Sequence, residues 1–316
     1  MQIVVIGAGN MGSVYGGNLS RIGQEVAFLD IWTEHVAAIQ AGGLHITGLT
    51  GDFIVRPYAT TDVSRLPKAD AVLICVNAYS TPEAARAAQT VLKETGYCLT
   101  LQNGVGNIEV LLELLGPRRV LAGLSFQSGD LSGPGSVRHT NNGPTYIGEL
   151  DRSRSPRLAQ LTELLKNAGM NPDPVDDVVA TIWAKFVHNC GINALCAITG
   201  LRPGNIQEVP ELLEFQRRII EEAVSLVRAK NVTLPNGDMV AAIQEYCSHK
   251  FHRPSMMQHL DRKQQTEIDS LNGYVARESP RYGLQALANE ALTMLMKGRE
   301  HRPIATHDGE EQLTRK

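Results

Sequence analysis

The sequence predicts a two-domain protein with an N-terminal doubly wound α/β domain, built on a parallel sheet, followed by an all-α C-terminal domain. Short apolar runs of four to six residues alternate with helical periodicity through the first half, as in a parallel sheet buried on both faces. A glycine-rich turn directly follows the first apolar run. After about residue 154 only helical patterns remain, so the composition changes where the second domain should begin.

The expected elements follow this alternation in order. We expect strands at 2–6, 25–30, 71–76, 97–102 and 119–126, and helices at 10–22, 33–41, 82–94 and 107–115. Residues 44–56 should form a hairpin insertion and residues 136–149 two further short strands. The later helices are expected at 155–169, 177–198, 209–230, 237–248, 255–278 and 286–298. The predicted domains are therefore 1–170 and 171–300, followed by a polar tail at 301–316.

Composition excludes several classes of protein. The 30 Lys and Arg residues against 33 Asp and Glu give a net charge of −3 with no basic cluster, which argues against nucleic acid or anionic membrane as a partner. No apolar run reaches the length of a transmembrane helix, and the N-terminus enters a strand directly, without a signal-peptide pattern. The five scattered cysteines are typical of a reducing compartment. We therefore expect a cytoplasmic protein with a small-molecule partner.

The glycine-rich turn predicts a dinucleotide site. Gly7, Gly9 and Gly12 form a GxGxxG pattern that follows a strand and opens a helix, which is the context this motif requires. In that context Gly7 allows the tight turn, Gly9 lets the pyrophosphate approach, and Gly12 lets helix and strand pack closely. The helix N-terminus adds unpaired N–H groups and a positive dipole. The first domain is thus expected to be a Rossmann domain; the alternative is a glycine turn that binds no nucleotide.

Asp30 predicts which cofactor is used. It ends the second expected strand, 18 residues after Gly12, where a carboxylate accepts hydrogen bonds from the adenosine ribose and repels a 2′-phosphate. No Lys or Arg occurs in the five residues that follow. Asp30 therefore favours NAD over NADP, unless it only caps the strand.

A row of polar residues interrupts an otherwise apolar helix at 178–198. Lys185, Asn189 and Asn193 are spaced by four residues, so they share one helix face within about 80° of rotation. A buried Lys is costly without a compensating partner, so this row predicts either a catalytic site or a structural set in which Lys pairs with a carboxylate.

Several motifs together resemble the ketopantoate reductase family. They run from the first strand to about residue 298, and the Lys-Asn-Asn and Ser…Glu motifs are more specific than the glycine turn. The resemblance is carried by Gly7-x-Gly9-x-x-Gly12, Gln102-Asn103-Gly104-Val105-Gly106, Gly133, Gly135, His139, Ile147-Gly148, Trp183-x-Lys185-x-x-x-Asn189-x-x-x-Asn193, Pro254-Ser255-Met256, Thr266-Glu267-Ile268-Asp269 and Asn272-Gly273. It implies an NAD(P)H-dependent enzyme that reduces a 2-oxo acid to an (R)-2-hydroxy acid, with a Rossmann N-terminal and a helical C-terminal domain.

The resemblance also implies roles for individual residues. Lys185 matches the general acid, and the substrate contacts match Asn103, Asn189, Asn193 and Ser255. The implied cofactor contacts are Gly7, Ala8, Gly9, Asn10, Met11, Gly12, Asp30, Asn77, Asn103, Ser128 and Glu267. No clustered metal-ligand spacing occurs, so no metal is expected.

Three positions depart from the family pattern. Asp30 stands where the family usually carries Arg or Lys for the NADPH 2′-phosphate, Asn77 replaces a common lysine, and Leu287-Ala288 replaces a Thr-Pro pair. The expected reaction is reduction of ketopantoate to (R)-pantoate in pantothenate biosynthesis. The alternatives are an NAD-dependent D-2-hydroxyacid dehydrogenase of the D-mandelate type and a non-enzymatic nucleotide sensor. The apolar faces of the helical domain favour a homodimer.

Overall fold

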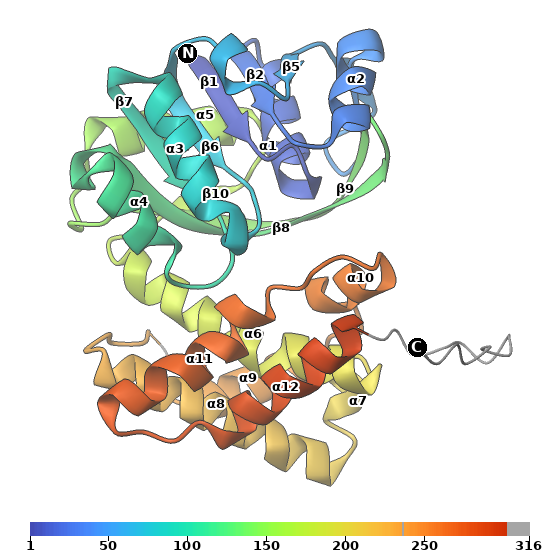
Figure 1. The fold of residues 1–316 in the computed structure, drawn as a ribbon, viewed down its shortest axis with the longest axis vertical. Coiled ribbons are helices and arrows are strands. Elements are labelled where there is room, and N and C mark those ends of the chain that lie inside the picture. The colour runs from blue at the N-terminus through green and yellow to red at the C-terminus, as the bar shows by residue number, and fades with distance from the viewer. Residues whose placement is uncertain (236, 302–316) are drawn as a thin grey trace, which may run out of the picture. The chain divides into compact units, whose positions relative to one another are not determined.

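The structure is a computed structural model, and it describes residues 1–235 and 237–301 (Figure 1). The chain divides into two compact units, Met1–Lys185 and a second unit that begins at Phe186. Helix α6 (Val178–Thr199) contains this boundary, so it contributes residues to both units. The domain limits inferred from the sequence, 1–170 and 171–300, remain predictions. The predicted polar tail lies, apart from His301, outside the described residues.

The first unit is organised around one mostly parallel sheet. Its strand order is β4-β3-β9-β8-β7-β6-β1-β2-β5, and β10 pairs with β9. Only the β8–β9 and β3–β4 pairs are antiparallel. The strands are β1 Gln2–Ile6, β2 Glu25–Leu29, β3 Leu44–Gly48, β4 Phe53–Val55, β5 Tyr58–Thr60, β6 Ala69–Ile74, β7 Leu92–Thr100, β8 Val120–Gly133, β9 Ser136–Glu149 and β10 Pro172–Pro174. The predicted fold class is confirmed.

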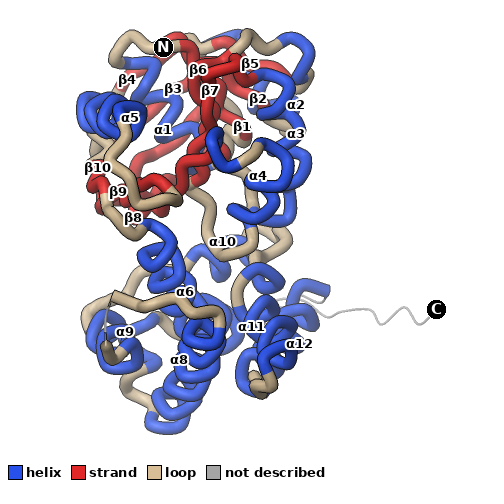
Figure 2. Tube along the Cα trace, turned by 90° about the vertical axis from the view of Figure 1, so that its left-hand side faces the viewer, coloured by secondary structure: helices blue, strands red, loops and turns tan. Residues whose placement is uncertain are grey.

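Helices cover both faces of this sheet (Figure 2). Alternate residues of β1 enter different cores: Ile3 and Val5 pack on one face, Val4 and Ile6 on the other. The first core contains residues of α1 (Asn10–Arg21), α2 (Thr33–Gly42) and α5 (Pro156–Asn167). The second contains residues of α3 (Thr81–Val91) and α4 (Asn107–Leu115). This double coverage explains why the strands appear in the sequence as unbroken apolar runs.

In the first unit one expectation is wrong, and two short strands were not expected. Residues 136–149 form one strand, β9, rather than two short strands. The polar stretch at Asn141–Gly143 resembles a break, but the chain stays paired with β8 there through shifts of register. The sequence also gave no signal for the three-residue strands β5 and β10, because such short strands lack a measurable period.

The second unit is helical. Its helices after α6 are α7 Pro203–Ile206, α8 Pro210–Ala229, α9 Met239–Ser248, α10 Ser255–Asp261, α11 Asn272–Glu278 and α12 Leu287–His301. The single helix expected at 255–278 is wrong. α10 ends at Asp261, Lys263 takes a left-handed conformation with φ 54°, and a short 3₁₀ turn at Ile268–Ser270 precedes α11. The run of polar residues from 261 to 265 removes the apolar face that would sustain a continuous helix.

Candidate functional site

The glycine loop has the geometry that the motif predicts. Gly7 has a φ of 91°, and a Cβ there would lie 2.8 Å from the Val76 backbone N. At Gly12 a Cβ would lie only 1.8 Å from the Gly7 carbonyl oxygen, so this helix residue packs directly on the turn. A Cβ at Gly9 would meet nothing within 4 Å. Gly7 and Gly12 are therefore required by the fold, whereas Gly9 faces open space.

The first turn of α1 leaves N–H groups for a ligand. Gly9 is the N-cap residue, and a glycine supplies no side-chain cap. The Asn10 side chain points elsewhere, because its Oδ1 accepts a hydrogen bond from the Leu131 N–H at 3.0 Å. Uncapped N–H groups beside open space at Gly9 fit the pyrophosphate of a dinucleotide.

Asp30 lies immediately after β2 and contacts this loop. Its Oδ2 accepts from the Ala8 N–H at 2.5 Å, and its Oδ1 accepts from the Trp32 N–H at 2.8 Å. A carboxylate has about four acceptor positions, so these bonds leave capacity for two ribose hydroxyls. Asp30 therefore has the structural role expected as the alternative, and it keeps acceptor positions for a ligand.

The other predicted cofactor residues of the first unit lie near strand ends. Asn77 follows β6, and its Nδ2 donates to the Tyr79 hydroxyl at 2.7 Å. Asn103 follows β7, and its carbonyl accepts from the Asn107 Nδ2 at 2.9 Å. Ser128 is exposed within β8. The carboxyl edge of a parallel sheet is where such folds bind ligands, and Asn77 and Asn103 lie at that edge.

Gln102 fixes the loop that carries Asn103, a role that the sequence analysis missed. It is buried, and its Nε2 donates to the Val76 carbonyl and the Thr81 hydroxyl, both at 2.9 Å. Thr81 in turn donates to the Asn107 Oδ1. The loop after β7 is therefore tied to the loop after β6. The signal was available, because Gln102 is a polar residue at the end of an apolar run, directly before Asn103.

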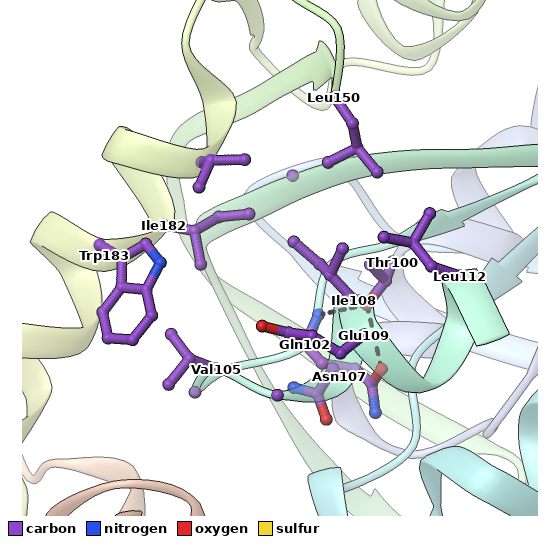
Figure 3. Close-up of a pocket in the computed structure, with 14 residues that line it drawn as sticks. Thr100, Gln102, Val105, Asn107, Ile108, Glu109, Leu112, Leu150, Ile182 and Trp183 are labelled. Carbon is purple, nitrogen blue, oxygen red and sulfur yellow. Dashed lines mark hydrogen bonds between the residues drawn. The ribbon is translucent and has the colours of Figure 1, made fainter. Parts of the chain in front are cut away.

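A cavity of about 290 Å³ borders this loop (Figure 3). Val105, Leu112, Leu150, Ile182 and Trp183 contribute apolar side chains to its wall. Gln102 and Asn107 also line it, but their amide groups are used in the hydrogen bonds of the loop. Thr100 and Glu109 also line the cavity, so its wall is mainly apolar with one carboxylate at its border.

Lys185 is anchored to strand β8. Its Nζ donates to the Ser125 carbonyl at 2.5 Å and lies 5.0 Å from the centre of the Phe126 ring. Tyr15 stabilises the same strand, because its hydroxyl donates to the Ser125 Oγ at 2.8 Å and lies 2.6 Å from the Thr145 Oγ1. Burial holds the pKa of Tyr15 well above its usual range. Lys185 is thus held by the backbone of Ser125, and the side chain of the same residue belongs to a hydroxyl network that the sequence did not reveal.

The remaining predicted residues belong to the second unit. Asn189 and Asn193 follow Lys185 on α6 and share its helix face; Asn193 is 7% exposed. Ser255 is the first residue of α10, and Glu267, also 7% exposed, precedes the 3₁₀ turn.

Asn272, quoted as part of a family motif, has a structural explanation. Its Nδ2 donates to the Cys190 carbonyl at 3.0 Å and to the Asn289 Oδ1 at 2.9 Å. Asn289 donates to the Glu222 carboxylate at 2.7 Å, so Asn272 joins α6, α11, α12 and α8 through buried hydrogen bonds. Such a motif residue holds the helices together.

Metal-ion sites and membrane spans are the two remaining kinds of feature to consider. Within residues 1–235 and 237–301, no group of three or more His, Cys, Asp or Glu is placed to hold a metal ion. Across the same part of the chain, no helix is long and apolar enough to cross a membrane.

Comparison with known proteins identifies the family. The family model described as "Ketopantoate reductase PanE/ApbA" matches residues 3–152, and the one described as "Ketopantoate reductase PanE/ApbA C terminal" matches residues 177–300. A 2-dehydropantoate 2-reductase of Pyrococcus horikoshii is 30% identical over 95% of this chain and 98% of its own length.

Solved structures agree with these matches. A PanE/ApbA family ketopantoate reductase from Ralstonia eutropha has a TM-score of 0.88 and 34% identity, covering 96% of this chain and 99% of its own. A D-mandelate dehydrogenase with NADH and anilino(oxo)acetate has a TM-score of 0.87 at 24% identity, over 95% and 99% of the two chains, and shows the shared fold. This chain therefore belongs to the ketopantoate reductase family of oxidoreductases.

Proposed function

We propose that this protein reduces ketopantoate to (R)-pantoate, using a reduced nicotinamide dinucleotide as cofactor. The observation that carries the proposal is the row of Lys185, Asn189 and Asn193 on one face of α6, in a chain that belongs to this family. A proton donor followed by two amides supplies the groups that a 2-oxo acid needs: an acid for its keto oxygen and hydrogen bonds for its carboxylate.

The glycine loop fits the proposed cofactor. Open space at Gly9 and the uncapped N–H groups of the first turn of α1 suit a pyrophosphate, and Asp30 has acceptor capacity for ribose hydroxyls. Asn77, Asn103 and Ser128 complete the proposed cofactor contacts in the first unit, and Glu267 does so in the second. When bound, the nicotinamide supplies the hydride.

The chain's own residues would handle the proton and the orientation of the substrate. Negative charge develops on the keto oxygen as its carbon is reduced, and the Lys185 ammonium donates first a hydrogen bond and then its proton to that oxygen. The Ser125 carbonyl holds the Lys185 Nζ in one place before the reaction. Asn103, Asn189, Asn193 and Ser255 orient the substrate, which lowers the entropic part of the barrier.

We infer that NADH is preferred over NADPH. Asp30 places a carboxylate just after β2, and two backbone N–H groups fix the position of its oxygens. A 2′-phosphate placed there would meet like-charge repulsion. That this fold accommodates NADH is supported by the D-mandelate dehydrogenase of the same fold, whose structure contains it.

A D-2-hydroxyacid dehydrogenase of the D-mandelate type is the second candidate function. The observation that favours it is Asp30 combined with Asn77, which removes two cations that the family usually places near cofactor and substrate. In this case the same Lys185 chemistry acts on other branched or aromatic 2-oxo acids.

A homodimer formed through α12 is also proposed. Leu287, Met294 and Leu295 are 63%, 62% and 54% exposed, and they share one face of this helix with two small residues, Ala291 and Gly298. Glu290 and Lys297 follow one flank of that face. Lys297 also pairs with Asp269 of its own chain, with its Nζ 2.8 Å from the Oδ1. Antiparallel packing about a two-fold axis would bring Glu290 of the second copy opposite this lysine, so the flanking charges as well as the apolar face are self-complementary.

The reaction proposed here needs a supply of reduced nicotinamide and a small 2-oxo acid, and we propose that it takes place in the cytoplasm. All five cysteines of the chain are present as thiols, which suits a reducing compartment.

A panel of 2-oxo acids, assayed with both NADH and NADPH, tests the function. We expect the highest kcat/KM for ketopantoate with NADH. A higher kcat/KM for benzoylformate or a branched 2-oxo acid would instead assign the second candidate function. Binding of the cofactor without turnover of any 2-oxo acid would overturn both and leave a nucleotide sensor.

A further inference from the structure

Five residues below the glycine loop form a closed set of contacts, which we call the loop ring: Ala8, Ser13, Asp30, Trp32 and His35. The Ala8 N–H donates to one oxygen of Asp30 and the Trp32 N–H to the other, at 2.5 and 2.8 Å. The Trp32 indole stacks on the His35 imidazole, with ring centroids 5.1 Å apart and planes 8° from parallel. The His35 Nε2 lies 3.4 Å from the Ser13 Oγ, which donates to the Ala8 carbonyl at 2.7 Å.

His35 has one defined tautomer in this ring. Its Nδ1 lies 3.0 Å from the N of Gly135, and a backbone N–H can only donate. The proton of the neutral imidazole is therefore on Nε2, where it points to the Ser13 Oγ, whose own proton is used on Ala8. His35 is 0% exposed, and this burial lowers its pKa, which favours the neutral form.

These contacts link the cofactor loop to a distant turn of the chain. Gly135 lies in the turn between β8 and β9, with φ 70°, and a Cβ there would come within 3.0 Å of the Ala38 Cβ. The turn is thus packed closely against α2. His35 connects it to the cofactor loop, because His35 contacts both Gly135 and Ser13, and Ser13 donates to Ala8. An apolar side chain at position 35 would fill the same volume without the free-energy cost of burying two ring nitrogens. The hydrogen bonds of the imidazole are therefore the reason for a histidine here.

We propose that His35 is a positioning residue for the cofactor, which holds the Ala8 backbone and the Asp30 carboxylate where the pyrophosphate and the ribose need them. This inference rests on the proposed cofactor site and deepens it. Two series of contacts lead from His35 to these groups. On one side the Ser13 hydroxyl donates to the Ala8 carbonyl, and on the other Trp32, which stacks on His35, donates its N–H to the Asp30 Oδ1.

The proposal has a kinetic signature. Two hydrogen bonds fix the proton donor: Lys185 Nζ donates to the Ser125 carbonyl, and the Tyr15 hydroxyl donates to the Ser125 Oγ. Neither bond involves a member of the loop ring. Loss of His35 should therefore weaken cofactor binding, while the chemical step of the fully loaded enzyme stays intact. A residue that only supports the fold would lower the melting temperature without this selective effect on binding.

The experiment compares His35→Phe with His35→Asn. Phe keeps the ring that stacks on Trp32 but removes both nitrogens, whereas the Oδ1 of Asn stands near the position of Nδ1 and accepts from the Gly135 N–H. His249→Phe, at an exposed histidine of the second unit, is the matched control. The dissociation constant of NADH is measured by calorimetry without substrate, together with kcat at saturating NADH and the melting temperature.

For His35→Phe we expect the dissociation constant to rise about tenfold, the effect of one or two lost hydrogen bonds, with kcat within about twofold of wild type. His35→Asn should restore most of the affinity, and His249→Phe should match wild type. Unchanged NADH affinity in His35→Phe, or an equal loss of kcat at saturation, would overturn the proposal.

Ser13→Ala keeps the test decisive if His35→Phe does not fold. This substitution removes only the hydroxyl between His35 and Ala8, and we expect it to raise the dissociation constant of NADH severalfold. An NADH affinity equal to that of wild type would overturn the positioning role of the loop ring. If the wild-type protein binds NADPH in place of NADH, the same comparisons are made with NADPH. Because binding is measured without substrate, failure of the ring is distinguished from failure of the proposed reaction.

Discussion

At the scale of single residues, the site depends on polar groups whose position is set by the backbone. Asp30 is held by two N–H groups, and the Lys185 ammonium by one carbonyl. A preorganised charge needs no reorganisation when a ligand arrives, which is why such groups act strongly on binding and catalysis. Replacing either group should have a distinct, measurable effect.

Lys185→Met should lower kcat by about 10²–10⁴, the range expected when an acid–base group is lost. Met keeps the aliphatic stem beside Phe126 but has no ammonium to donate to the keto oxygen. Steady-state kinetics with ketopantoate measure the effect, and Lys166→Met, at an exposed lysine of α5, is the control. A kcat near that of wild type would exclude Lys185 as the acid.

Asp30→Asn should reduce the preference for NADH over NADPH. The amide keeps one acceptor oxygen but loses the charge that repels a 2′-phosphate, and loss of a charged hydrogen-bond acceptor changes affinity by about tenfold or more. The ratio of kcat/KM for the two cofactors measures this change. If the ratio stays as in wild type, Asp30 only fixes the Ala8 and Trp32 backbone.

At the scale of elements, the turn between β1 and α1 shows that one motif contains two kinds of glycine. The carbonyl of Gly7 leaves no room for a Cβ at Gly12, whereas Gly9 has an ordinary φ of −66° and open space around it. Packing requires the first kind, whereas the space at the second is where we propose that the pyrophosphate binds.

Two alanine substitutions should separate these roles. Gly12→Ala should lower the free energy of unfolding by about 1–3 kcal/mol, because the new methyl overlaps the Gly7 carbonyl. Gly9→Ala should leave the melting temperature near wild type and raise the dissociation constant of NADH, because its methyl occupies the space of the pyrophosphate. Thermal melts and calorimetry measure both; tight NADH binding by Gly9→Ala would argue against this site.

At the scale of the whole molecule, the exposed apolar face of α12 is the surface through which we propose that two copies associate. Met294→Asp should convert the proposed dimer to a monomer, because it sets two like charges close together near the two-fold axis. Light scattering after size-exclusion chromatography measures the mass. Leu49→Asp, at an equally exposed leucine of the first unit, is the control, and a monomeric wild-type protein would contradict the proposal.

The stability of the molecule should fall in mild acid. Burial lowers the pKa of His35 and His139 below the ordinary value of 6.5. In mild acid the unfolded chain therefore binds more protons than the folded chain, which lowers the free energy of unfolding. Their contribution is fully present above pH 6.5 and is lost as the pH falls through the lowered pKa. Melting temperatures at pH 7.5 and 5.5 measure the loss, which should be smaller in His139→Gln and unchanged in His249→Gln.

The sequence determined the class of this fold and most of its candidate site. Buried parallel strands leave apolar runs, and the glycine turn, Asp30 and the Lys185 row have periods or spacings set by local geometry. Only the tertiary structure revealed the unbroken strand β9, the division of 255–278 into separate helices, and the pairing of Gln102 with the loop after β6.

The loop ring shows the reason most clearly. Ala8 and Asp30 lie in two different loops and His35 lies in α2, and Gly135 is 100 residues from His35 in the chain. No local period relates them, so their hydrogen bonds exist only once the sheet has brought the strand ends together. The sequence thus indicated the residues that we propose to contact a cofactor, and the tertiary structure decided which residues hold them in place.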